Sequence, residues 1–353
     1  MACGKAGCYA VASGLRGLAG ASMRKTHVAV LMGGVSSEHQ VSLKSGAMVS
    51  GNIDRAKYDV TQVVITQEGH WKFPGEERLD IYHALPRLRE LKVNCVFIAL
   101  HGPFGEDGRM QGMFDAFGMP YTGSGCAASA LAMDKIHSKA VARQAGVRVA
   151  DQFLVTRQEW DADHAAIIAR VERDFGYPCL IKSPCQGSSI GMAIPKDTAH
   201  FQASLLDVFM YGDLVMVEKF INGTEVTCAV LDVEPGKPPR ALPVTEICPV
   251  ESEFFDYHAK YTPGACNEIT PARISEAATR RVQAVAERVH QVIGCAGFSR
   301  SDFILDGDDP VWIEVNTIPG MTETSLYPQA AAAAGISFQQ MLGLFIEEAL
   351  ARK

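Results

Sequence analysis

The sequence predicts an α/β protein of two or three domains, with α+β character in its C-terminal half, and three observations support this prediction. The chain has 353 residues, which is more than one ordinary hydrophobic core holds. In the first third, apolar runs typical of buried strands alternate with helical patterns, which predicts a small parallel sheet covered by helices. Near the end, residues 300–325 have the pattern of a β-hairpin that continues into a loop.

The N-terminal part contains three predicted strands, THVAVLM, YDVTQVVIT and NCVFIAL. The first leads into GGVSSE and a helical pattern from Val41 to Ile53, so unpaired N–H groups at the helix start can face an anion. Glu38 in this turn either caps the helix or holds a substrate ammonium, and the residues alone favour the cap. The third strand ends in HGPFGEDG, where such sheets collect their ligands, so His101 together with the loop from Gly102 to Gly108 is a functional candidate.

Residues 123–128 fit the dinucleotide pattern G-x-G-x-x-A. The preceding PYT is a poor strand, however, and no acidic residue closes a new strand about 20 residues later, so a nicotinamide site is disfavoured. We expect one helix from Ala127 to Ala145, with Gly146 as its terminating residue.

A second α/β unit begins near Val147. Its strand GYPCLIKSP carries Lys182, and the loop CQGSSIGM after it can cradle phosphate oxygens through Ser188, Ser189 and backbone N–H groups. The P-loop pattern G-x-x-x-x-G-K-[ST] is absent.

The segment DLVMVEKFINGTEVTCAVL has the pattern of a strand pair joined by Asn222-Gly223. The edge of VEKFI can offer backbone groups and Phe220 to a flat heterocycle, and Glu225 can bond a ribose hydroxyl. The following aromatic segment, EFFDYHAKYTPGACNEITPA, predicts a loop, and residues 275–293 predict a helix.

The C-terminal hairpin brings chemical groups onto one face of a strand pair. A turn at residues 306–310 fixes its register, because antiparallel strands pair by counting outward from the turn. The expected pairs are Leu305 with Val311, Asp302 with Glu314, and Arg300 with Asn316.

Period-two alternation places Arg300, Asp302, Glu314 and Asn316 on one face, with Trp312 on the Glu314 face. Two carboxylates directly opposite, with Cβ atoms about 4.5 to 5.5 Å apart, repel unless a cation neutralises them. Two carboxylates and an amide are oxygen ligands that suit Mg²⁺, which also binds substrate phosphates. A solvated hairpin is the alternative; the apolar flanks favour a metal and phosphate site.

The composition excludes several classes of protein. The net charge is −7 with no Lys/Arg-rich run, which gives no indication of nucleic acid, and no apolar run reaches the about 18 residues of a membrane span. The 10 cysteines form no C-x-x-C and most lie in apolar runs, which predicts buried thiols in a reducing cytoplasm. Residues 1–23 lack acids, so we expect a disordered extension there or a start codon assigned too early, with Met23 as the functional start; a transit peptide is the alternative.

Eight motifs together carry a family resemblance: GGVSSE, HGPFGEDG, YTGSG with MDK, IKSPCQGSSIGM, VEKFI, DYHAKY, RSDF and EVNTIPGMTETS. From about Lys25 to the C-terminus, in this order, the chain resembles the D-alanine-D-alanine ligases of the ATP-grasp superfamily. The resemblance implies a homodimer whose chain has three domains, with ATP held between the last two. These domains are an N-terminal substrate domain at 24–123, a central domain at 124–216, and a C-terminal catalytic domain at 217–353.

The resemblance also implies a reaction. ATP phosphorylates the carboxylate of one D-alanine, and the amine of a second D-alanine attacks the acylphosphate, in the cytoplasm, for peptidoglycan precursor synthesis. The implied ligands of Mg²⁺ or Mn²⁺, two ions per site, are Asp302, Glu314 and Asn316. The implied nucleotide residues are Lys135, Lys182, Ser188, Ser189 and Lys260 at the phosphates, Glu218, Lys219, Phe220 and Ile221 at the adenine, and Glu225 at the ribose.

The implied substrate and catalytic residues surround the two amino acids. Glu38 anchors the first D-alanine ammonium, which replaces the capping interpretation. The other implied residues are His101 at the substrate, Arg300 and the Gly320 amide at the oxyanion, Ser325 and Leu326 at the second carboxylate, and Ser188 and Tyr261, which connect with Glu38 and close the site.

Two positions depart from the family pattern: Ser183 separates Lys182 from the proline, and His258 stands where an acid is common. A depsipeptide ligase that uses D-lactate is one alternative, and Tyr261 argues against it because the loop of dipeptide-forming members ends in this Lys-Tyr pair. A nonenzymatic ATP-binding sensor is another, and it would be expected to lack the metal carboxylates, which are present.

Overall fold

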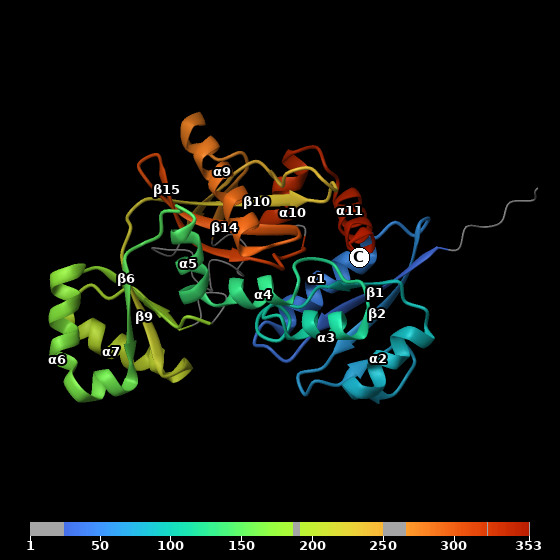
Figure 1. Ribbon diagram of the computed structural model, residues 1–353, viewed down its shortest axis with the longest axis horizontal. Helices are drawn as coiled ribbons and strands as arrows, with labels where there is room; N and C mark the ends of the chain where they lie inside the picture. The colour runs from blue at the N-terminus through green and yellow to red at the C-terminus, as the bar shows by residue number, and fades with distance from the viewer. Residues whose placement is uncertain (1–24, 186–190, 250–265, 323, 353) are drawn as a thin grey trace, which may run out of the picture.

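The computed structural model describes residues 25–185, 191–249, 266–322 and 324–352. Within these ranges the strands form three sheets, which lie one after another along the molecule (Figure 1). None of the helices in the described ranges is long and apolar enough to span a membrane. Mixed strands and helices agree with the predicted fold class.

The first sheet has the order β4-β3-β2-β1-β5. Its strands are β1 Thr26–Gly33, β2 Tyr58–Ile65, β3 Trp71–Lys72, β4 Arg78–Leu79 and β5 Cys95–Ile98, and its helices are α1 His39–Asn52, α2 Ile81–Glu90 and α3 Arg109–Phe117. The strand β1 pairs in parallel with β2 and β5, as predicted, whereas β3 and β4 add an antiparallel edge that the sequence analysis did not predict. Both edge strands have two residues, too few for a period-two pattern.

The predicted helix at 127–145 is wrong, because the chain forms two helices here. These are α4 Cys126–Met133 and α5 Lys135–Gln144. Between them Asp134 is extended, with φ −87° and ψ 101°, and its side chain accepts from the N–H groups of Ile136 and His137. Asp134 is therefore an N-cap, which starts a new helix at Lys135.

The second sheet has the order β6-β9-β7-β8. Its elements are β6 Gln152–Thr156, β7 Cys179–Lys182, β8 Met192–Ala193 and β9 Leu214–Lys219, with α6 Arg157–Asp174, α7 Thr198–Val208 and η1 Phe209–Tyr211. The strand β9 pairs with β6 and β7, not with the strand that follows Asn222-Gly223. The predicted hairpin there is therefore wrong, and the domain boundary expected after residue 216 would divide β9.

The third sheet has the order β13-β12-β10-β14-β15, and β11 also pairs with β10. Its strands are β10 Thr224–Asp232, β11 Arg240–Ala241, β12 Thr245–Pro249, β13 Cys266–Ile269, β14 Gly297–Asp306 and β15 Asp309–Asn316. The remaining helices are α9 Glu276–Ile293, α10 Leu326–Ala333 and α11 Phe338–Ala351. The predicted helix at 275–293 is confirmed, with Ser275 as its N-cap.

The hairpin β14–β15 has the predicted register at its functional end and a different register at its turn. The pairs are Arg300 with Asn316, Asp302 with Glu314, Phe303 with Trp312, and Leu305 with Pro310. The turn is one residue tighter than predicted, and a bulge between Asp302 and Phe303 adds one residue, Ile313, on β15. The bulge turns Trp312 to the face opposite Glu314, where its Nε1 donates to Ser301 Oγ, so the predicted shared face is wrong.

The described cysteines are free thiols, and the predicted burial holds for only half of them. Cys95, Cys179, Cys228 and Cys295 are buried, and Cys185 is exposed beside the segment 186–190, which is not described. Burial raises the pKa of Cys95 to about 12, so this thiol stays protonated and behaves as a small apolar side chain.

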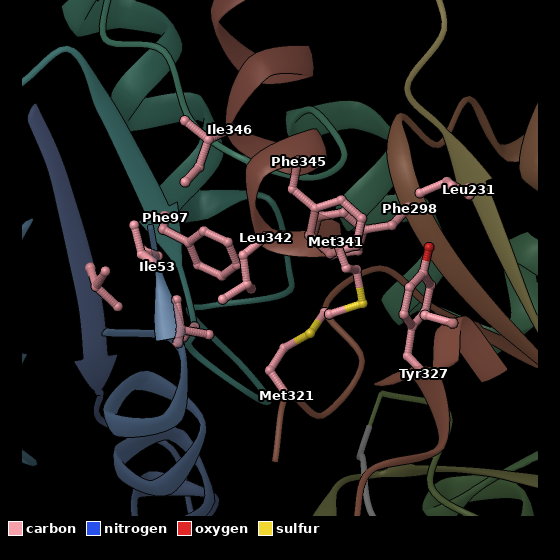
Figure 2. Packing of buried hydrophobic residues seen from close by; sticks show 14 of the residues in the cluster. Ile53, Phe97, Leu231, Phe298, Met321, Tyr327, Met341, Leu342, Phe345 and Ile346 are labelled. Carbon is pink, nitrogen blue, oxygen red and sulfur yellow. The ribbon is translucent and has the colours of Figure 1, made fainter. Parts of the chain in front are cut away.

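One apolar core joins the first and third sheets through α11. Figure 2 shows Phe97 of β5 directed towards Leu342, and Phe345 stacked beside Phe298 of β14. The rings of Phe298 and Phe345 lie 4.1 Å apart, and the ring of Tyr327 lies 5.7 Å from Phe345. This core fixes the N-terminal sheet against the hairpin and so against the site described below.

The substitution Phe345→Ala should lower the free energy of unfolding by about 3 to 5 kcal/mol, because it removes a fully buried ring from a core that cannot collapse around the cavity. Tyr82 is 82% exposed, so Tyr82→Ala is a matched control that should change the free energy by less than about 0.5 kcal/mol. Urea denaturation measures both, and equal effects would contradict the role of this core.

Candidate active site

The centre of the site is a carboxylate on β14 that is held by three neighbours. Arg300 Nε and Nη2 donate to Asp302 Oδ1 and Oδ2, each at 2.9 Å. Thr227 Oγ1 donates to Oδ1 at 2.6 Å, and Asn316 Nδ2 donates to Oδ2 at 3.1 Å. The bidentate pair fixes both side chains on the face that period-two alternation predicts.

The opposing carboxylate, Glu314, is paired with a cation from a helix. Lys135 Nζ lies 3.0 Å from Glu314 Oε2, and both side chains are largely buried. Burial lowers the pKa of Lys135, but the Glu314 carboxylate outweighs that effect and the pKa is raised. Each acid of the Asp302 and Glu314 pair therefore has a cation beside it.

The expected metal ligands are two carboxylates and an amide. Within the described residues, no group of three or more His, Cys, Asp and Glu side chains could hold a metal ion. Asp302, Glu314 and Asn316 nevertheless form an oxygen-rich set at paired positions of one hairpin, which suits Mg²⁺ that keeps water and phosphate ligands. Because Arg300 and Lys135 already neutralise the two acids, carboxylate repulsion alone does not require a metal.

Glu38 lies at the start of α1 and is 6% exposed. Its side chain makes no capping hydrogen bond, so the structure does not support the capping interpretation. A Cβ at Gly102 would lie 2.5 Å from Glu38 Oε2, and Gly102 has φ +75°. Only glycine meets both requirements, so the chain passes directly over this buried carboxylate.

His101 precedes that glycine and connects the first sheet to the loop after β15. Its Nε2 lies 2.8 Å from Ser45 Oγ and its Nδ1 lies 3.0 Å from the Ile318 carbonyl. Burial lowers the pKa of His101, so the ring is held in its neutral form. These contacts place the histidine beside the site as a positioned, neutral side chain.

The loop that follows β15 brings in Gly320, Ser325 and Leu326. Thr322 N–H donates to Ser325 Oγ at 2.9 Å, and a Cβ at Gly320 would lie 2.8 Å from the same oxygen. Ser325 is the N-cap of α10 without a side-chain capping bond, and Leu326 begins the helix. A helix N-terminus with unpaired N–H groups is suited to a carboxylate.

Two expected nucleotide residues meet on the second sheet. Lys182 Nζ of β7 lies 3.0 Å from Glu218 Oε2 of β9. The flanking ammonium groups of Lys139 and Lys182 outweigh the effect of burial and lower the pKa of Glu218 to about 2. The carboxylate is therefore ionised at neutral pH.

The other expected nucleotide residues continue from Glu218 along the chain. Lys219 ends β9 and is exposed, and Phe220 and Ile221 are half-buried in the connection to β10. Glu225 is half-buried on β10, opposite Ile304 of β14. This connection runs from the second sheet to the third, where the resemblance implies the nucleotide.

Four expected residues, Ser188, Ser189, Lys260 and Tyr261, lie outside the described ranges. Their implied roles at the phosphates and in closing the site stay predictions.

Comparison with known proteins decides the family. The model described as D-ala D-ala ligase N-terminus matches residues 27–124, and the model described as D-ala D-ala ligase C-terminus matches residues 141–347. The chain belongs to the D-Ala-D-Ala ligase family.

Relatives and solved structures agree with this assignment. The D-alanine--D-alanine ligase of Syntrophobacter fumaroxidans is 42% identical over 332 residues, covering 93% of this chain and 99% of the relative. The VanG D-Ala:D-Ser ligase from Enterococcus faecalis superposes with a TM-score of 0.78 at 34% identity, covering 92% of this chain and 100% of that one. The D-alanine--D-alanine ligase from Bacillus anthracis complexed with ATP superposes with a TM-score of 0.74 at 31% identity, covering 93% of this chain and 98% of that one. The expected ATP-grasp fold and ligase class are thereby confirmed.

Glu106 lies in the candidate site of this D-Ala-D-Ala ligase family member, although it was not singled out from the sequence. It accepts from Gly102 N–H at 2.7 Å and Ile318 N–H at 3.3 Å, and with Lys135, Glu314 and Asn316 it lines a cavity of about 30 Å³. Burial, and then the Glu38 carboxylate, raise the pKa of Glu106 to about 8. Its position in HGPFGEDG, at the end of a strand, was the available signal.

Lys139 was also missed. It is 1% exposed and its ammonium contacts Glu218 Oε1. The signal was its spacing: Lys135 and Lys139 are four residues apart on one helix and therefore share a face.

The raised pKa of Glu106 predicts a pH dependence of stability. Between the ordinary value of 4.5 and the folded value of about 8, the folded protein keeps a proton that the unfolded chain releases. The free energy of unfolding should therefore fall as the pH rises from 5 to 8, by at most about 1.4 kcal/mol per pH unit from this group. Glu106→Gln cannot titrate, so its slope should be smaller than that of the wild type in urea denaturation.

Glu77 is exposed, so Glu77→Gln provides the control and should keep the wild-type slope. Equal slopes in the wild type and Glu106→Gln would show that Glu106 is already ionised at pH 5.

Proposed function

We propose that this protein joins two D-alanine molecules into D-alanyl-D-alanine in an ATP-dependent reaction through an acylphosphate. The observation that carries the proposal is the convergence of Arg300, Asp302, Glu314 and Lys135 with the buried Glu38 and His101. A nonenzymatic nucleotide sensor would not need this combination of metal-binding acids and a substrate-anchoring carboxylate. The relatives named D-alanine--D-alanine ligase support the same activity.

Glu38 holds the ammonium of the first D-alanine, because its carboxylate lies buried at the start of α1 under Gly102, where an ammonium group can pair with it. With its ammonium held by Glu38, the first D-alanine directs its own carboxylate towards the lysines that bind the nucleotide phosphates. Lys135 and Lys182 attract the nucleotide phosphates as compact point charges. Oxygen-bound Mg²⁺ or Mn²⁺ at Asp302, Glu314 and Asn316, when present, supplies charge neutralisation for phosphoryl transfer.

The amine of the second D-alanine, after it has lost a proton to solvent, attacks the carbonyl carbon of the acylphosphate, and negative charge develops on the carbonyl oxygen. The C–O bond to phosphate then breaks, and inorganic phosphate leaves as the peptide bond is completed. Arg300 faces the carbonyl oxygen with a guanidinium that Asp302 holds in a fixed orientation. The Gly320 N–H is the second donor, in the manner of an oxyanion hole. Ser325, with Leu326 at the N-terminus of α10, binds the second carboxylate.

Several wider features rest on the same proposal. The product serves peptidoglycan precursor synthesis, the reaction takes place in the cytoplasm, and the enzyme acts as a homodimer. Ser188 and Tyr261 close the site over Glu38, and Ser189 and Lys260 contact phosphate.

The test is phosphate release from ATP and Mg²⁺ with single and paired acceptors, followed by the product mass. D-alanine alone should support turnover and give the dipeptide, whereas L-alanine should not. D-serine and D-lactate are added with D-alanine, because a structurally similar protein is a D-Ala:D-Ser ligase. A product containing mainly D-lactate would replace the proposal with a depsipeptide ligase, and no phosphate release with any pair would overturn it.

The substitution Glu314→Gln should reduce turnover at least about a hundredfold, because it removes a metal ligand and the partner of the Lys135 ammonium. The exposed Asp308 lies at the tip of the same hairpin, so Asp308→Asn removes the same charge away from the site and should keep turnover within about twofold of the wild type. Steady-state phosphate release and circular dichroism check activity and folding. Wild-type turnover in folded Glu314→Gln would remove Glu314 from the metal site.

A further inference from the structure

A buried cluster of charge lies between the second sheet and α5. Lys139 of α5, Lys182 of β7 and Glu218 of β9 are 1%, 4% and 2% exposed. Lys182 lies 3.0 Å from Glu218 Oε2, and Lys139 contacts Oε1, the other oxygen of the same carboxylate. One acid is therefore shared by two lysines, one on each side.

The strand register explains this arrangement. Glu218 pairs with Leu180 and Lys182 pairs with Met216, so the Glu218 and Lys182 side chains are diagonal neighbours on one face of the sheet. Lys139 reaches the carboxylate from the helix that covers this face. Glu218 and Lys182 would form a neutral ion pair on the sheet without any help from α5. Lys139 therefore adds a second basic side chain beside a single acid.

The additional cation has an energetic consequence. Taking a lysine out of water costs free energy unless an acid compensates it, and here two ammonium groups share one carboxylate. Burial, together with the nearby Lys182, lowers the pKa of Lys139 to about 7 despite the attraction of Glu218. A bound anion near Lys182 would relieve this imbalance, and a polyphosphate is an anion of that kind.

The helix α5 also connects this cluster to the catalytic hairpin. Lys135 contacts Glu314 of the third sheet, and Lys139, one turn later, contacts Glu218 of the second sheet. The two sheets that the connection 220–223 joins are therefore also linked by one helix face. A change in the position of α5 would move both cations together.

We propose that Lys139 is a positioning residue of the nucleotide site, which holds the Glu218 carboxylate and thereby leaves the Lys182 ammonium with positive charge for the nucleotide phosphates. This inference rests on the proposed use of ATP. With Lys139 protonated, the cluster carries one net positive charge; when Lys139 is deprotonated or removed, Glu218 neutralises Lys182. Lys139 also holds Glu218, the first residue of the segment 218–221 that is proposed to contact the adenine. Loss of Lys139 should therefore affect adenine binding as well.

The first experiment compares Lys139→Met, which keeps the length of the side chain and removes its charge, with the wild type. The exposed Arg143 lies one turn further along α5, so Arg143→Met is the matched control. Calorimetry with a nonhydrolysable ATP analogue and Mg²⁺ measures nucleotide affinity without turnover. Lys139→Met should raise the Kd for the nucleotide at least about tenfold, because it loses a charged hydrogen bond, while Arg143→Met should leave it within about twofold.

A second measurement separates positioning from general structural damage. In steady-state assays of Lys139→Met, the KM for ATP should rise, whereas the KM for D-alanine should stay within about twofold of the wild type, because Glu38 and Ser325 are on other elements. Lys139→Arg keeps the charge and should recover most of the nucleotide affinity. Equal losses for ATP and D-alanine, or no rescue by arginine, would overturn the positioning role.

The pH profile provides a test that does not depend on the methionine variant folding. The charged groups facing Lys139 are Glu218 from β9 and Lys182 from β7, with Lys135 one turn earlier on its own helix. As the pH rises from 6 to 9, Lys139 loses its proton, so the Kd of the wild type should rise relative to that of Lys139→Arg, whose guanidinium stays charged. Taking the ratio cancels the ionisation of the nucleotide itself, and a constant ratio would overturn the inference.

The outcomes distinguish the two proposals. A wild-type protein that does not bind the nucleotide at all would overturn the proposed function, and this inference with it. A wild type that binds ATP and forms the dipeptide, with unchanged nucleotide affinity in folded Lys139→Met, would overturn only the role of Lys139.

Discussion

The pairing of Asp302 with Glu314 across β14 and β15 is the constraint on which the site depends. Two carboxylates on one face of a hairpin repel, and each must have a cation when it is buried. Arg300 comes from the same strand, two residues away. The second cation comes from α5, so this helix must begin beside the hairpin. The Asp134 cap, which ends one helix and starts the next at Lys135, provides that start point.

The same helix connects two parts of the candidate site. One turn after Lys135, the Lys139 side chain reaches Glu218 on the second sheet, so α5 contacts the acids of two sheets. On the other side, His101 connects the first sheet to the loop after β15 through the Ile318 carbonyl. Hydrogen bonds and ion pairs of this kind are directional, and in the low dielectric of the interior a buried polar group without its partner costs free energy. Polar contacts across the site and the apolar core around Phe345 therefore fix the relative positions of the sheets that carry the site.

The sequence predicted the strand pairs that follow from residue spacing near a turn. It failed where contacts between residues far apart in the chain determine the pairing. The pairs Asp302 with Glu314 and Arg300 with Asn316 follow from a turn and a period of two, and they are confirmed. The turn itself is tighter than predicted, and the bulge at Ile313 restores the register, which no local pattern shows. Asn222-Gly223 is a local hairpin signal, but the strands on either side pair with distant partners in two different sheets. The spacing of Lys139 from Lys135 indicates only a shared helix face, whereas its partner Glu218 is 79 residues away and follows from no local pattern.

The charges of the described site also indicate which ligand charge each part of the site can bind. Around α5, four basic side chains, Arg300, Lys135, Lys139 and Lys182, contact three acids, Asp302, Glu314 and Glu218, which leaves an excess of one positive charge when Lys139 is protonated. That excess favours an anion such as a polyphosphate. Beside Glu38, the raised pKa keeps Glu106 largely protonated near neutral pH, so Glu106 adds little negative charge there. The proposed amino acid substrate matches this distribution of charge when its carboxylate is directed towards the basic side chains, because opposite charges then meet.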